Sequence, residues 1–108
     1  MSKKEKRIEE ENALLAKVYD LILNTETTAD ERSMLIEFKN SVESGKDFQK
    51  AIMKLAENLR LLALKKHTHN ETLTTEVGKF YMDISTTGYF EKNLGYGISV
   101  LGTVLNIN

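Results

Sequence analysis

The side chains that could bind a metal or react covalently are few in this chain. His67 and His69 are the only histidines, and there is no cysteine to complete a zinc site with them. Two residues apart, they would point to different sides of a helix. We expect both to be exposed turn residues that follow a helix end. We therefore predict no metal site and no cofactor.

Catalytic and nucleic-acid-binding patterns are also weak. The serines lack the strand–turn–helix setting that a nucleophile requires, and the late glycines lack the frame of a phosphate loop. Glu9, Glu10 and Glu11 resemble a solvated run of charge more than an acid/base pair. The few basic residues near the start are followed at once by acids, and the pI is about 6.1. An enzyme and a nucleic-acid-binding protein are both disfavoured.

Charge is unevenly distributed, although the net charge is only −1. Within residues 46–69, six cations stand against two anions, a net of +4. Cations at the end of a helix complement its dipole, so a solvated helix face is one interpretation of this segment. An electrostatic docking face is the other.

Size and composition predict one soluble domain over residues 1–108. The chain is 41% hydrophobic and 29% charged, which is ordinary for a globular protein. The acidic run at Glu9 interrupts what would otherwise be the start of a signal peptide. No segment reaches the roughly 20 apolar residues of a membrane span. We expect a cytoplasmic protein.

Apolar spacing predicts four helices, over residues 5–24, 29–44, 48–66 and 71–86. Thr28 and Glu31 have the spacing of a capping box at the second helix, and Thr68 and Glu71 have it before the fourth. Gly45 suits a left-handed cap between the second and third helices. The links are short, so the expected fold is all-α, an antiparallel four-helix bundle.

Each predicted helix carries a stripe for the core. The first stripe is Ile8, Leu15, Val18, Tyr19 and Ile22; the second is Met34, Leu35, Phe38 and Val42; the third is Phe48, Ile52, Leu55, Leu59 and Leu62; the fourth is Leu73, Val77, Phe80, Tyr81 and Ile84. The third helix is the most apolar, and we expect it to be central.

The last segment, residues 88–108, differs from the rest. No charged residue follows Lys92, and four of the six glycines lie here. We expect this apolar, glycine-rich tail to pack on the bundle, either folded back along it or as a short fifth helix. Five of the eight aromatic residues lie in the last 29 positions, which suits either the end of the core or a binding surface.

Several stretches resemble the bacteriocin immunity proteins of the enterocin A immunity family of Gram-positive producers. They are "LLAKVYDLILN" (14–24), "LIEFKNSVESGKDFQKAIMKLAENLRLLALKK" (35–66), "EVGKFYMDIS" (76–85) and "FEKNLGYGISVL" (90–101). The resemblance implies a cytoplasmic helical bundle that protects its cell from pediocin-like peptides. It also implies a protein partner, a membrane sugar-transport receptor complex with the toxin bound, whose leak the immunity protein blocks.

The resemblance assigns recognition to the C-terminal half of the chain. Mapped onto this sequence, the expected recognition residues are Tyr81, Tyr89, Phe90, Lys92, Leu94, Tyr96, Ile98 and Leu101. Peripheral membrane association is compatible with this function. An alternative is a small helical adaptor or regulator with a soluble protein partner, and dependence on a membrane receptor separates the two.

Overall fold

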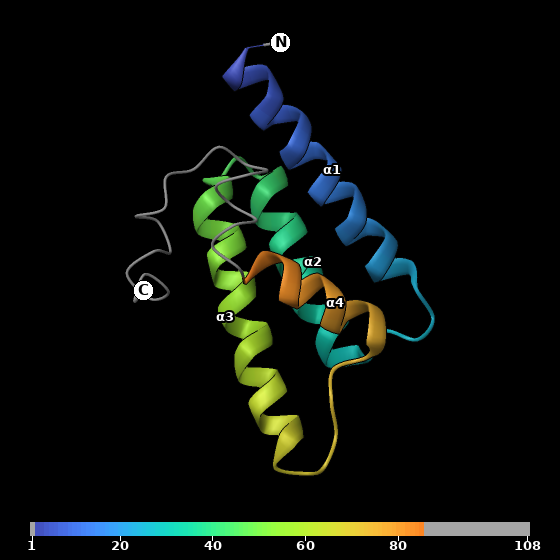
Figure 1. The fold of residues 1–108 in the computed structure, drawn as a ribbon. Helices are drawn as coiled ribbons and strands as arrows, with labels where there is room; N and C mark the ends of the chain where they lie inside the picture. Colours follow the sequence, from blue (N-terminus) through green and yellow to red (C-terminus); the bar gives the residue numbers. More distant parts are fainter. Residues whose placement is uncertain (1, 86–108) are drawn as a thin grey trace, which may run out of the picture.

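The computed structural model describes residues 2–85, which form four helices and no strand (Figure 1). They are α1 (Lys3–Leu23), α2 (Ala29–Glu43), α3 (Phe48–His67) and α4 (Thr75–Ile84). Helices α1, α2 and α3 run alternately down, up and down in Figure 1, and α4 crosses in front of α2. The predicted all-helical bundle is confirmed for this part of the chain. The expected tail or fifth helix lies outside the described residues.

Local sequence signals define the pair α2 and α3. Thr28 and Glu31 form the predicted capping box, in which each side chain accepts a hydrogen bond from the other residue's backbone N–H. Gly45 has a φ of 93°, the left-handed geometry expected after a helix end. Asp47 then caps α3 by accepting from the Lys50 amide at 3.0 Å. The turn between the helices is therefore encoded within a few residues.

The core lies between the four helices and, within residues 2–85, is apolar apart from Thr27 and Glu31. Its buried hydrophobic residues are Leu14, Val18, Leu21, Leu35, Phe38, Phe48, Ile52, Leu55, Leu59, Leu62, Val77, Phe80 and Ile84. All five stripe positions predicted for α3 are among them. The rings of Phe38 and Phe48 meet edge to face, with centroids 5.6 Å apart, where α2 joins α3.

The predicted core face of α1 needs correction. The helix buries Leu14, Val18 and Leu21, whereas Ile8 is about half exposed. Tyr19 is exposed too, because its hydroxyl donates to the Glu43 carboxylate at the end of α2. Leu15 and Ile22 pack only at the edge of the core. Val18 is common to the predicted and the observed stripe, but Leu14 and Leu21 are the buried residues beside it, instead of Leu15 and Ile22.

The predicted start of α4 at residue 71 is also wrong. The Thr68 hydroxyl donates to the Lys65 carbonyl at 2.6 Å, so it serves the end of α3 and caps no new helix. Asn70 then adopts a φ of 58°, and the Glu71 amide returns to the Lys66 carbonyl at 2.8 Å. This arrangement closes α3 and leaves residues 71–74 as a connecting segment before α4.

No helix within residues 2–85 has the length and hydrophobicity needed to cross a membrane.

A candidate partner-binding groove

An open groove lies between the end of α3, the connecting segment and α4, and we call it the α3–α4 groove. Its lining is mainly apolar and consists of Ala63, His67, Glu71, Thr72, Leu73, Gly78, Lys79, Tyr81 and Met82. Tyr81 is the one predicted recognition residue that the structure describes. Tyr89, Phe90, Lys92, Leu94, Tyr96, Ile98 and Leu101 lie outside the described residues.

Helix α4 divides its side chains between the core and this groove. Val77, Phe80 and Ile84 face inward and are buried. Tyr81 is half-buried against the core, and Met82 is 60% exposed. A large thioether at that exposure offers adaptable contact area to a partner. Tyr81, packed against the core, therefore forms one side of the groove, and Met82 forms an exposed apolar rim.

Glu31 sets the position of α4 from the start of α2. Its Oε2 accepts from the Thr74 amide at 2.8 Å, and its Oε1 accepts from the Thr74 hydroxyl at 2.9 Å. Thr74 is the N-cap of α4 and makes no capping bond with its own side chain. One carboxylate thus completes the capping box of α2 and anchors the N-cap residue of α4 as well.

This carboxylate is fully buried and carries its charge without a paired cation among its hydrogen-bond partners. Burial alone would raise its pKa, because it disfavours the charged form. Hydrogen bonds from Thr28 and Thr74 outweigh that effect, and the pKa of Glu31 lies below its ordinary value. The ionised form is therefore the one that the fold selects.

The sequence contained a signal for this arrangement that the helix predictions did not use. Glu31 precedes Leu35 and Phe38 by four and seven residues, which places it on the buried stripe of α2. A carboxylate on such a stripe must find hydrogen-bond donors, since burying it without them is costly. Its partner Thr74 lies 43 residues away along the chain, and no local spacing identifies it.

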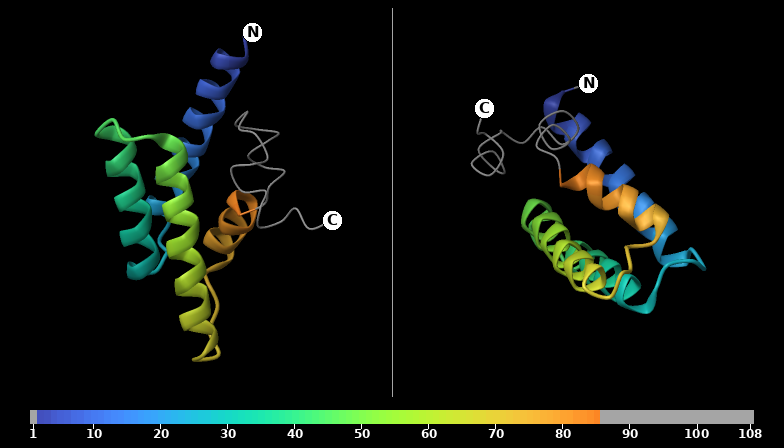
Figure 2. Two further views of the ribbon diagram at one scale, coloured as in Figure 1. Left: turned by 90° about the vertical axis from the view of Figure 1, so that its left-hand side faces the viewer. Right: turned by 60° about the horizontal axis from the view of Figure 1, so that its bottom comes forward.

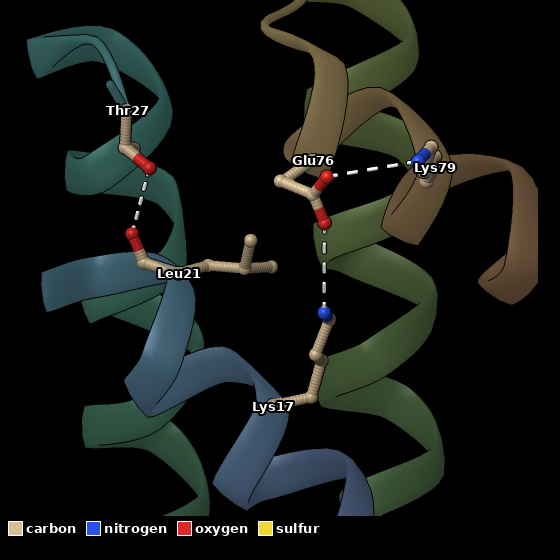
Figure 3. Close-up of polar contacts among 5 residues, drawn as sticks. All are labelled: Lys17, Leu21, Thr27, Glu76 and Lys79. Carbon is tan, nitrogen blue, oxygen red and sulfur yellow. Dashed lines mark hydrogen bonds and ion pairs between the residues drawn. The ribbon is translucent and has the colours of Figure 1, made fainter. Parts of the chain in front are cut away.

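On its other side, α4 is tied to α1 by an ion-pair cluster (Figure 3). Glu76 lies 3.9 Å from the Lys17 ammonium of α1 and 3.6 Å from Lys79 of α4 itself. The end of α1 is held in turn by the Thr27 hydroxyl, which donates to the Leu21 carbonyl at 2.7 Å. Exposed ion pairs contribute little stability, so we infer that this cluster mainly orients α4 relative to α1.

The histidines take two different places. His67 belongs to the last turn of α3 and lines the groove, whereas His69 lies beyond the helix with Nδ1 3.1 Å from the Lys65 carbonyl oxygen. Both are exposed, as predicted. Within residues 2–85, no group of three or more His, Cys, Asp or Glu side chains could hold a metal ion. The groove is suited to binding an apolar surface.

The bacteriocin immunity protein family matches the chain over residues 9–89. This range covers most of α1, all of the other three helices and the whole α3–α4 groove. The match confirms the resemblance that the apolar positions and link lengths indicated. Neither a curated protein nor a solved structure gives a significant match.

Proposed function

Because this chain belongs to the bacteriocin immunity protein family, we propose that it protects a cell by binding, from the cytoplasm, a membrane receptor complex that the toxin has engaged. In this proposal the receptor is a sugar-transport complex, and the bound immunity protein blocks the leak that the toxin causes. The role requires recognition of a protein surface and no chemical step.

The observation that carries the proposal is the α3–α4 groove. Tyrosine and methionine are enriched at protein interfaces, and the groove presents Tyr81 and Met82 side by side on α4. Residues 86–108 follow directly after α4 and contain the other seven predicted recognition residues. The groove and this segment are therefore neighbours along the chain, and we propose that both contribute to recognition.

A matched pair of surface variants tests the groove. Met82→Gln removes apolar character from the groove rim, and Leu23→Gln removes it at the end of α1, where the side chain is 77% exposed. Both changes should leave stability within about 0.5 kcal/mol, because neither side chain is in the core. Each variant is expressed in a toxin-sensitive strain and challenged with a panel of pediocin-like peptides. We expect Met82→Gln to lose protection and Leu23→Gln to keep it.

A segment exchange tests where specificity lies. Residues 73–108 are grafted onto a family member that protects against a different toxin. The recipient should acquire the specificity of this chain. A folded graft that retains the recipient's specificity would assign recognition to the first part of the fold.

The receptor is tested separately from the groove. In a strain that lacks the sugar-transport complex but is made sensitive by another route, the proposal predicts no protection. Protection that persists there would favour the alternative, an adaptor with a soluble protein partner.

A further inference from the structure

A second surface, distinct from the α3–α4 groove, runs along the outward side of α3. Leu61 and Leu64 are 50% and 53% exposed and lie three residues apart, about one turn of the helix. Leu61 follows the buried Leu59 by two residues, about 200° around the helix at 3.6 residues per turn. These leucines therefore point away from the core and do not belong to it.

Lysines accompany the leucines along the same side. Residues three, four or seven positions apart share one side of this helix. What we call the outer α3 face consists of Lys50, Met53, Lys54, Leu61, Leu64 and Lys65. The Met53 side chain is 36% exposed, and the three lysines are exposed. The face thus combines apolar side chains with long cationic ones.

The charge of this face is positive. Glu57 is the one acid that shares its spacing, and Arg60 neutralises it through Nε and Nη2, which donate to the two carboxylate oxygens at 3.0 and 2.7 Å. Lys54 lies 3.1 Å from Glu37 of α2, whereas Lys50 and Lys65 have no ion-pair partner among residues 2–85. The two lysines nearest the ends of the face are therefore available to an external anion.

The arrangement of the helices leaves this face accessible. The last turns of α3, which include Leu64, extend beyond the ends of α2 and α4 in Figure 1 and in the left view of Figure 2. No other described helix covers them on the outward side. A flat surface could approach this end of α3 without displacing another helix of residues 2–85.

We propose that the outer α3 face docks the protein on an anionic lipid bilayer surface. A helix with leucines on the surface and lysines around them lies in the plane of the membrane interface, where the leucines enter the headgroup region. The lysine stems cover apolar surface while their ammonium groups reach the phosphates. This inference does not require the proposed receptor contact, although docking would bring the adjacent groove to the membrane.

Charge complementarity favours a lipid surface as the occupant. The whole chain has a net charge of −1, so it is not drawn to anionic vesicles as a whole. Any attraction must come from a local cationic face. Because part of the attraction is electrostatic, partitioning should fall as the salt concentration increases.

The test is sedimentation of the full chain with large vesicles of phosphatidylglycerol and phosphatidylcholine in equal parts, compared with phosphatidylcholine alone. The double variant Lys50→Gln/Lys65→Gln should lower partitioning onto the anionic vesicles about tenfold or more. Lys4→Gln/Lys6→Gln removes the same number of cations from α1, outside the outer α3 face, and should change partitioning less than about twofold.

A second variant tests the apolar part. Leu61→Gln/Leu64→Gln should lower partitioning about tenfold at unchanged charge. Circular dichroism and a denaturant midpoint should match those of the unaltered chain, since both side chains are half exposed. Equal partitioning onto neutral and anionic vesicles would overturn the proposal, as would lysine and leucine variants that bind as well as the control. Failure here would leave the groove variants, which are read out by protection, unaffected.

Discussion

Helices α3 and α4 pack against each other, but the interactions that define them have different origins. Helix α3 spans 20 residues, has its own N-cap in Asp47 and ends in a basic turn that complements its dipole. Helix α4 spans 10 residues and makes no side-chain cap of its own. Its N-cap residue, Thr74, is held instead by Glu31, from α2. One helix is encoded locally, and the other depends on a tertiary contact.

This difference bears on function, because α4 carries the groove residues Tyr81 and Met82. A helix of ten residues is marginal in isolation, since its nucleation is costly and few bonds follow. Its stability therefore comes from Val77, Phe80 and Ile84 in the core and from Glu31 at its start. We expect α4 to open locally at a lower free energy than α3.

The largest effect is expected at the centre of α3. Leu59 is completely buried, so Leu59→Ala removes apolar contacts and leaves a cavity that costs about 2 to 5 kcal/mol. Denaturant unfolding measures this loss, with Leu61→Ala as the control, which should stay within about 0.5 kcal/mol. If the two variants unfold alike, Leu59 does not face the core and the orientation assigned to α3 is wrong.

The next effect should separate the two helices. Glu31→Gln keeps the size of the side chain but places an amide NH₂ among donors that need an acceptor. We expect a loss of about 2 kcal/mol, the scale of a hydrogen bond to a charged group. Hydrogen exchange should show that the backbone amides of α4 exchange much faster in this variant, whereas those of α3 change little.

The matched control for that variant is Asp47→Ala. It removes the local cap of α3 and should cost about 1 kcal/mol, with the faster exchange confined to the first turn of α3. If amide exchange in Glu31→Gln became faster to the same degree in all four helices, α4 would not open as a separate unit.

Acid should weaken the same contact. The folded pKa of Glu31 lies below its ordinary value of 4.5, because the hydrogen bonds from Thr28 and Thr74 outweigh the opposing effect of burial. The stability that it contributes is complete above the unfolded pKa and is lost as the pH falls through the folded pKa. The stability difference between the unaltered chain and Glu31→Gln should therefore shrink as the pH falls from about 5 through the folded pKa of Glu31. If this stability difference stayed constant as the pH falls, the charge of the Glu31 carboxylate would not contribute to stability.

The same contrast explains how far the sequence predicts the structure. The core stripe of α3, the capping box of α2 and the left-handed Gly45 depend on neighbouring residues, and all three were predicted. The start of α4 depends on a contact across 43 residues, and it was not. In α1, leucines at both 14 and 15 offer two faces, and only packing against α2 selects the first.

The candidate site follows the same rule. Tyr81 was predicted from its helix and from the family resemblance. Ala63, His67 and Leu73 were not predicted to belong with it, because they come from α3 and from the connecting segment. Helical periodicity assigns a side chain to a face, but it does not say which faces meet. The outer α3 face is an exception, since all of its members lie on one helix.

The smallest effect concerns Gly78, where stability and function should move in opposite directions. A Cβ added there would meet the Leu73 Cβ at 3.9 Å, an ordinary contact, so α4 does not need a glycine for close packing. Gly78→Ala should therefore stabilise the protein by about 0.5 to 1 kcal/mol, because alanine loses less backbone entropy in a helix. The same methyl group narrows the α3–α4 groove that Gly78 lines. If the groove binds the partner, protection from the toxin should fall although the fold is more stable.

Ser33→Ala on the exposed side of α2 is the control, since it should raise stability by about 0.5 kcal/mol without touching the groove. Equal protection by both variants would show that the partner does not enter the groove at Gly78, and recognition would then have to lie beyond α4.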